Sequence, residues 1–216
     1  MALIAKYTFE WNSNDSVGGF NGTDTAITYV TGKSWQGASM NGTTSWISIV
    51  GNTGINLSSN QTYAFWLNLS ALPGDWLQLR LWNGYWPSSP YGMFISFLNT
   101  AWTYSLRMDY SSGITSTVNQ TLSTWTWYRL AFVHDDTADT DYIYLNGSAI
   151  LTQWSRTANP SASATATKRI WCEDWTGKFT NWIFDEFYIY NNAWTSTDAL
   201  NDYNSFANNS NFFMFF

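Results

Sequence analysis

The sequence predicts an all-β protein built as a two-sheet sandwich. Its 216 residues suit one large domain, because sandwiches and barrels commonly reach ~200–250 residues as a single unit. Apolar and polar residues alternate in short runs rich in aromatic and β-branched side chains, separated by clusters of Gly, Asn, Ser and Pro. These runs number about a dozen, which is more than one open sheet normally holds, so we expect two sheets.

The strand pattern is found along the whole chain. It covers residues 4–9, 27–30, 38–40, 46–49, 63–68, 76–82, 92–98, 105–109, 127–134, 141–145, 168–172 and 184–190. Asn146-Gly147 predicts a hairpin, because this dipeptide tolerates the positive φ angles of a type I′ turn. One short helical turn is predicted over 196–203, where Ser or Thr can cap a turn that carries Leu200 and Tyr203.

The composition excludes several classes of partner and chemistry. Charged residues make up only 11% of the chain, against about 25% in ordinary domains, so the surface must consist mainly of uncharged polar residues. A net charge of −6 with nine scattered Lys and Arg disfavours nucleic acid. The single cysteine, Cys172, cannot form an intramolecular disulfide or a cysteine metal cluster. A neutral partner fits this surface best.

Aromatic residues, at 19%, exceed what one core needs. A segment that alternates aromatic residues with Gly and Pro, where loops are normally polar, predicts sugar recognition, since an aromatic ring stacks on the apolar face of a pyranose. The candidate carbohydrate-binding residues are Trp82, Asn83, Tyr85, Trp86, Tyr91 and Trp102. The alternative is a satellite aromatic cluster or a buried protein contact. The strand aromatics Trp66, Trp127, Tyr142, Tyr144 and Tyr188 are expected to belong to the core or to the packing between the sheets.

Four segments, in order, resemble the laminin-G-like jelly-roll domain of the concanavalin-A-like lectin/glucanase superfamily. They are residues 14–23 with 37–49, 63–68, 127–134 with 142–147, and 184–194. The resemblance covers most of residues 1–205 and implies an antiparallel jelly-roll sandwich that binds carbohydrate or serves adhesion. It departs from the family pattern at Ser45, where an acidic residue is usual, and in the aromatic-rich segment 76–102.

The resemblance also implies a possible structural calcium site. Relatives often bind Ca²⁺ where the strand corresponding to 184–190 meets the opening loop, and hard cations prefer oxygen ligands. Asp185 would be the ligand carried over, with Asp15 as a weaker partner. The alternative is that these acids are solvated or cap a loop.

Catalysis is not expected. Enzymatic relatives cut glucans with two carboxylates on one strand face, ~5–5.5 Å apart in retaining enzymes. The acids of this chain instead occur as adjacent pairs, Glu173-Asp174 and Asp185-Glu186, whose side chains would point to opposite faces of a regular strand. The only histidine, His134, lies on an alternating strand and is expected to be packed or hydrogen-bonded.

The ends of the chain suggest a second hypothesis. Residues 1–9 predict a first strand without the apolar run of a signal peptide, and nothing approaches the ~20 apolar residues of a membrane span. Residues 206–216 form a polar spacer and an apolar tail, which would promote aggregation if it were free. The predicted assembly contact is Phe212, Phe213, Met214, Phe215 and Phe216. The domain would then be a structural or attachment subunit of an extracellular or virion surface, docked through this tail.

Overall fold

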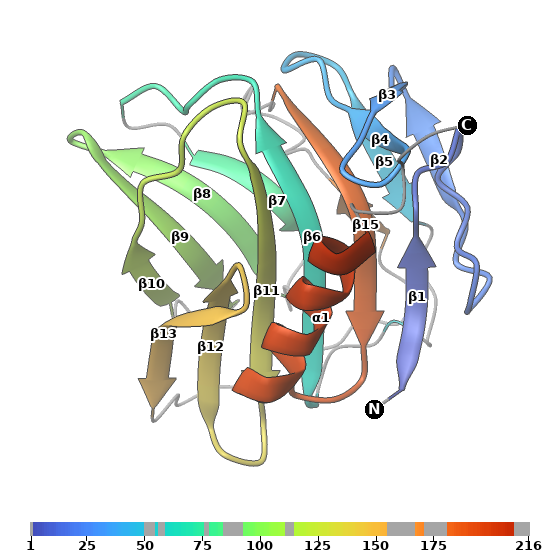
Figure 1. The fold of residues 1–216 in the computed structure, drawn as a ribbon. Coiled ribbons are helices and arrows are strands. Elements are labelled where there is room, and N and C mark those ends of the chain that lie inside the picture. The colour runs from blue at the N-terminus through green and yellow to red at the C-terminus, as the bar shows by residue number, and fades with distance from the viewer. Residues whose placement is uncertain are drawn as a thin grey trace.

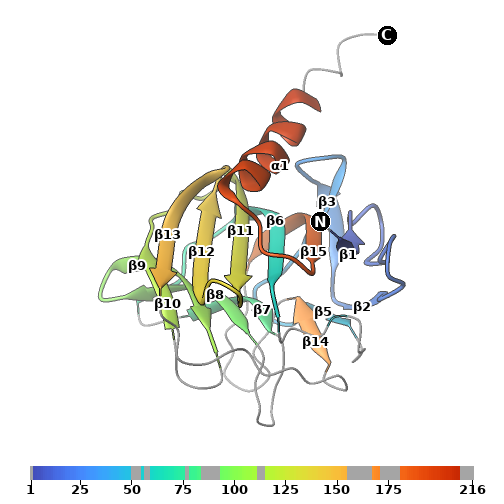
Figure 2. The same ribbon diagram turned by 90° about the horizontal axis from the view of Figure 1, so that it is seen from below.

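The computed structural model describes residues 2–49, 55, 59–75, 78–83, 93–110, 115–154, 167–170 and 181–209. Two antiparallel sheets face each other as two layers, and the helix α1 (Ser196–Asn209) lies against the outside of one of them (Figures 1 and 2). The predicted two-sheet sandwich is confirmed.

We name the sheet that carries the helix sheet A, and the face that it turns away from sheet B its outer face. In order, its strands are β13 (Ser148–Trp154), β12 (Thr140–Leu145), β11 (Trp127–Asp135), β6 (Gln61–Leu69), β15 (Trp182–Tyr190), β4 (Gln36–Ser39) and β3 (Thr28–Thr31), and β1 (Leu3–Tyr7) also pairs with β15. Sheet B contains β10 (Thr115–Asn119), β9 (Thr103–Asp109), β8 (Phe94–Thr100), β7 (Gln78–Asn83), β14 (Lys168–Ile170), β5 (Trp46–Ile49) and β2 (Gly22–Thr25).

Sequence patterns did not predict β2, β10 and β13, and all three lie at sheet edges. Two of them are dominated by Thr and other small polar residues, with the sequences GTDT and TSTVN. An edge strand has a neighbour on only one side and buries less of its surface, so the hydrophobic alternation that identifies a strand is weak there. The Asn146-Gly147 turn is confirmed, with φ angles of 50° and 79°.

The main core lies between the sheets and is rich in aromatic rings. On β6, alternate residues such as Tyr63, Phe65 and Leu67 belong to this core. The Phe65 ring lies 5.9 Å from Phe132 and 5.6 Å from Phe187, measured between ring centroids. Ten aromatic residues are buried in this one core.

The outer face of sheet A is buried as well, because α1 packs on it. Ala64, Ala131, Val133, Tyr144 and Trp194 form a second apolar cluster there with Ala199 of the helix. The predicted packing of Trp66, Tyr144 and Tyr188 is confirmed, since all three are buried. They lie on the outer face beneath the helix or the β3–β4 loop, however, and not in the main core. Trp127 and Tyr142 are half-buried.

Helix α1 is 14 residues long, well beyond the single turn predicted. It starts with a capping box, in which the Thr195 hydroxyl accepts the Asp198 N–H (3.2 Å) and the Asp198 carboxylate accepts the Thr195 N–H (2.8 Å). Tyr203 and Phe206 both contact the Trp66 ring, so tertiary packing extends the helix through Asn-rich sequence. The predicted boundary at 205/206 therefore lies within the helix, and the predicted contact 212–216 lies outside the described residues.

No helix in the described ranges has the length and apolarity to cross a bilayer.

Candidate ligand-binding surface

Among the residues that the structure describes, four exposed tryptophans share an unusual backbone conformation. Trp11, Trp35, Trp102 and Trp125 are 68%, 69%, 77% and 70% exposed, with φ angles of 66°, 67°, 65° and 58°. The left-handed region costs a residue with a side chain about 1–2 kcal/mol, and an exposed ring recovers little of this by burial. Strained positions that do not stabilise the fold are candidates for function.

Trp102 occupies a two-residue turn between β8 and β9. Thr100 pairs with Thr103, and Ala101 and Trp102 between them both have positive φ, which is the pattern of a type I′ turn. Such turns favour Asn-Gly, as at Asn146-Gly147 in this chain. The Trp102 N–H donates a hydrogen bond to Asp75 Oδ1 (3.3 Å).

Trp125 lies in the connection from β10 to β11, and its N–H donates to the carbonyl oxygen of Leu69 at the end of β6 (2.8 Å). Residues 69–75 thus run between the backbone of Trp125 and that of Trp102. The Asn99 amide holds this segment by donating to the Pro73 carbonyl (3.1 Å), and the Ser70 N–H donates to the Asn181 carbonyl (2.9 Å). The backbones of the two tryptophans thus flank a pinned loop, and the connections that carry them gather at one end of the sandwich (Figure 1). We call this the loop end.

Trp102 lies at the opposite end of β8 from the backbone of Asn83. Asn83 pairs with Phe94 at the start of β8. Trp102 follows the far end of β8, and seven residues of extended strand span roughly 20 Å. Tyr85, Trp86 and Tyr91 lie outside the described residues, as do the side chains of Trp82 and Asn83. The carbohydrate-binding role of these six residues stays a prediction.

Trp11, Trp35 and Trp125 were missed by sequence reasoning. Each lies in a short polar context, with the sequences EWNSN, KSWQG and STWTW. A tryptophan among small polar residues was the available signal, but it is weaker than a run of aromatics.

The acidic residues Asp15 and Asp185 have separate roles in the fold. Asp15 Oδ1 accepts the N–H groups of Lys6 and Val17, and Oδ2 accepts those of Gly18 and Phe20, at 2.8–3.0 Å. The carboxylate therefore closes its own loop, as the capping alternative anticipated. In the described ranges, no group of three Asp, Glu, His or Cys residues is placed to hold a metal ion.

Asp185 and Glu186 share one face of sheet A, contrary to the expectation for adjacent strand residues. A β-bulge interrupts β15, where Asp185 pairs with Trp66 but Tyr188 pairs with Ala64. Phe184 and Phe187 both enter the main core, so the two acids between them lie on the outer side. Asp185 Oδ2 accepts the Ser34 N–H (2.7 Å), and Glu186 accepts the Tyr188 hydroxyl. Burial raises the pKa of Asp185 to about 8.

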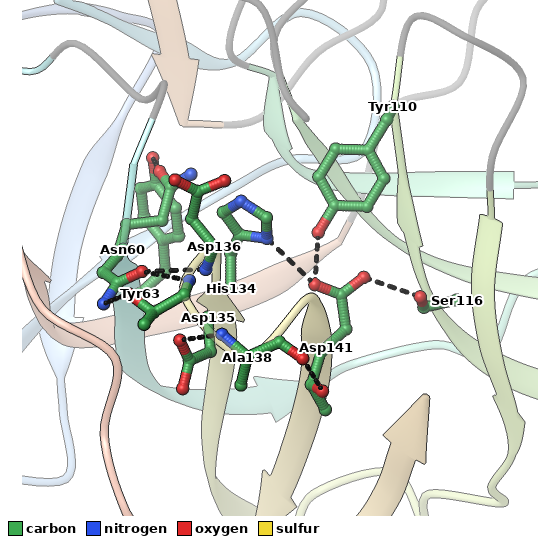
Figure 3. Close-up of polar contacts among 12 residues, drawn as sticks. Asn60, Tyr63, Tyr110, Ser116, His134, Asp135, Asp136, Ala138 and Asp141 are labelled. Carbon is green, nitrogen blue, oxygen red and sulfur yellow. Dashed lines mark hydrogen bonds and ion pairs between the residues drawn. The ribbon is translucent and has the colours of Figure 1, made fainter. Parts of the chain in front are cut away.

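His134, near the C-terminal end of β11, belongs to a buried polar network (Figure 3). Its Nδ1 lies 3.3 Å from Asp141 Oδ1, which also accepts the Tyr110 hydroxyl (2.8 Å). Ser116 donates to Asp141 Oδ2 (2.6 Å). Asp141 bonds Ser116 directly. His134 therefore does not lie between the carboxylate and the serine hydroxyl, where the general base of a serine nucleophile lies. His134 is fully buried, which confirms the expected packed, hydrogen-bonded role.

A family model for the concanavalin A-like lectin/glucanases superfamily matches residues 41–199. The chain belongs to this superfamily. The laminin-G-like resemblance of the sequence is thereby confirmed, and the jelly-roll sandwich and C-terminal helix agree with it. No curated protein matches the sequence of this chain.

Solved structures share the fold at low sequence identity. The binding domain of Paraclostridial Mosquitocidal Protein 1 is 18% identical, with a TM-score of 0.77, over 95% of this chain and 52% of that one. Domain 4 of AbnA, a GH43 extracellular arabinanase from Geobacillus stearothermophilus solved with arabinotriose, is 22% identical (TM-score 0.72) over 92% and 97%.

The ligand-binding domain of botulinum neurotoxin serotype D, solved with N-acetylneuraminic acid, is 13% identical (TM-score 0.72) over 94% and 50%. The chain thus spans about half the length of the mosquitocidal-protein domain and of the neurotoxin domain, but nearly the whole of the arabinanase domain.

Proposed function

We propose that this domain is a non-catalytic carbohydrate-binding module of an extracellular surface, with Trp102 and Trp125 at the loop end as its sugar-stacking residues. The observation that carries the proposal is the strained, outward presentation of both indoles around the pinned segment 69–75. Carbohydrate in the structures of the arabinanase domain and the serotype D toxin domain supports the same class of ligand.

The chemistry of the loop end suits a neutral, hydroxyl-rich ligand. An indole offers a flat apolar face to the C–H groups of a sugar ring and loses little side-chain entropy on binding. Exposed Thr100, Thr103 and Thr126 are neighbours of the two indoles in sequence and can exchange hydrogen bonds with sugar hydroxyls at the rim.

The acids of β15 do not resemble a glycosidase pair. Asp185 and Glu186 are both buried, lie beneath the β3–β4 loop and helix α1, and are engaged in hydrogen bonds within the domain. A hydrolytic pair must instead flank an accessible glycosidic bond. Binding without hydrolysis is therefore the function that the described carboxylates favour.

Retention of the protein on a panel of immobilised neutral and sialylated glycans tests the proposal. W102A and W125A should each weaken binding by about 3–10-fold, and the double variant should lose most of it, because each ring contributes a stacking contact. V17A is the matched control, since it truncates another exposed apolar residue. Full affinity in the double variant, or no retention of the wild type on any glycan, would refute the proposal.

Calcium at Asp185 with Asp15 stays a prediction of the family resemblance, as a structural ion. Binding at Asp15 would require the ion to displace backbone N–H groups from the carboxylate. If the prediction is right, EDTA lowers the melting temperature and added Ca²⁺ restores it. An unchanged melting curve would count against it.

A further inference from the structure

The geometry points to a second carbohydrate-binding site, formed by Trp11 and Trp35, through which the module engages a neutral polysaccharide at a place separate from the loop end. This inference rests on the proposed function, because it assigns the same ligand class to a second pair of indoles. The pair comes from two loops that are distant in sequence, the one that follows β1 and the one that joins β3 to β4.

The two loops meet next to both tryptophans. The Glu10 carboxylate lies close to the backbone N–H of Gln36, and β1 and β4 pair with adjoining stretches of the same strand, β15. Glu10 directly precedes Trp11, and Gln36 directly follows Trp35, so the two exposed tryptophans are carried by neighbouring segments. Together, two exposed rings on neighbouring loops can offer a sugar chain more stacking surface than either ring alone.

Trp35 is held by a loop that has little freedom to move. The Gly32 N–H donates to the Trp35 carbonyl (2.9 Å), and the Ser34 N–H donates to buried Asp185 Oδ2 (2.7 Å). A Cβ atom on Gly32 would lie 2.6 Å from the same carboxylate oxygen, so the loop sits directly on the acid. The Lys33 ammonium lies 4.8 Å from the centre of the Trp66 ring.

The backbone around Trp11 is anchored by the residues that precede it. Phe9 is fully buried in the main core and, like Trp11, has a positive φ of 57°. The Trp11 N–H donates to the Phe9 carbonyl (2.9 Å), and the Asn12 amide donates to the Glu10 carbonyl (3.0 Å). The Phe9 ring is buried and the Trp11 ring is exposed, so the buried ring anchors the backbone that carries the exposed indole before a ligand binds. Such preorganisation lowers the entropy cost of binding.

The surroundings select an uncharged ligand. Glu10 and Lys33 contribute one charge of each sign, and Asn12 and Gln36 contribute amides at the rim. This balance offers no net attraction to an anionic or cationic chain, whereas amides and a carboxylate bond sugar hydroxyls well.

The two indole pairs are too far apart to share one sugar. Trp125 precedes β11 and Trp35 precedes β4, and these strands are separated in sheet A by β6 and β15. Three strand spacings amount to about 14 Å across the sheet. Figure 1 shows the β3–β4 loop beside β15, on the other side of helix α1 from β13 and β12. A long or clustered glycan could engage both sites, and their avidity would then exceed the affinity of either.

The test uses the full chain with arabinan, xylan and mixed-linkage β-glucan as probes, in affinity electrophoresis and in calorimetric titration with their short oligosaccharides. We expect two sites per chain in the wild type and one in W11A/W35A. Polysaccharide retention should fall about 3–10-fold in W11A/W35A, and it should vanish only when W102A/W125A is added. W11Y/W35Y keeps a ring at each position and should recover part of the retention, and V17A should behave as the wild type.

The outcomes separate the two proposals. If W11A/W35A keeps wild-type stoichiometry and retention while W102A/W125A loses both, the second site is wrong and the proposed function stands. If only W11A/W35A loses binding, the second site stands and the loop end is wrong. If the wild type binds none of these probes and no glycan of the wider panel, both proposals fail.

Discussion

The guanidinium of Arg129 on β11 forms a bidentate ion pair with the carboxylate of Asp202 on helix α1. Its Nε lies 2.6 Å from Oδ2 and its Nη2 lies 2.9 Å from Oδ1. The remaining nitrogen, Nη1, donates to the carbonyl of Glu186 in the β-bulge (2.8 Å), and the rings of Tyr188 and Phe206 lie about the guanidinium at 5.0 and 4.9 Å. One buried cation thus ties the helix to the irregular part of β15.

Removing the partner of this cation should destabilise the domain strongly. D202A leaves the Arg129 charge buried without its carboxylate, which we expect to lower the free energy of unfolding by about 3 kcal/mol. Urea denaturation measures the change. N201A, which truncates an exposed residue on the same helix, should stay within about 0.5 kcal/mol of the wild type. A similarly small effect of D202A would show that the pair does not hold the helix.

The strain at Trp102 should be visible in stability. W102G should be more stable than W102A by about 1 kcal/mol, because glycine adopts a positive φ without a steric cost and alanine does not. At Trp127, the first residue of strand β11, the order should reverse, since glycine has the lower preference for extended strand structure. Thermal melts of W102G, W102A, W127G and W127A provide the comparison. Equal stability of W102G and W102A would argue against the left-handed turn.

Asp185 should make stability depend on pH. Burial, with a further contribution from Glu186, raises its pKa from an ordinary value near 4 to about 8. Between these values the unfolded chain loses the proton while the folded protein keeps it. The contribution of the Asp185 carboxyl to the free energy of unfolding is therefore complete below about pH 4. It is lost as the pH rises to about 8, at up to about 1.4 kcal/mol per pH unit.

D185N cannot titrate at this position. The difference in the free energy of unfolding between D185N and the wild type should therefore shift in favour of D185N between pH 5 and pH 8. The free energies of unfolding of both proteins, measured at the two pH values, give this difference. D136N, which removes one charge from the β11–β12 loop, should follow the wild type. Parallel pH profiles of wild type and D185N would contradict the assignment.

The buried network around Asp141 should contribute to stability and not to ligand binding. S116A removes the hydroxyl that donates to Asp141 Oδ2, and we expect a loss of about 1.5–3 kcal/mol, typical of a hydrogen bond to a charged group. T117A, on the exposed side of the same strand, should cost far less. Chemical denaturation tests stability, and glycan retention should be unchanged in both variants. Reduced retention in folded S116A would revise this role.

The alternative of an assembly subunit depends on Phe212, Phe213, Met214, Phe215 and Phe216 and stays a prediction. If this tail docks in a neighbour, deletion of 212–216 should convert a discrete oligomer into a monomer in light scattering. Replacement of the same five residues by Ser should do likewise, because it removes the apolar surface and keeps the chain length. The same mass for all three proteins would exclude the tail as the contact.

The sequence predicted the parts of this protein that depend on local patterns. Period-two alternation located most strands, and the positive-φ preference of Asn-Gly located the β12–β13 turn. The solitary His134 was correctly expected to be structural. Low charge and abundant rings pointed to a neutral, carbohydrate-like ligand, because composition sets the chemistry of a surface whatever its shape.

Tertiary structure alone decided which residues meet. It placed Trp102 and the backbone of Asn83 at opposite ends of β8, and it turned Asp185 and Glu186 to one face through a bulge. It also brought the loop that carries Trp11 close to the loop that carries Trp35, because β1 and β4 pair with adjoining stretches of β15. Strand register, bulges and loop contacts arise from packing between distant segments, and a single sequence carries little local trace of them. The pattern of residues thus determined the fold and the class of chemistry, while the arrangement of the exposed indoles depended on how the strands align.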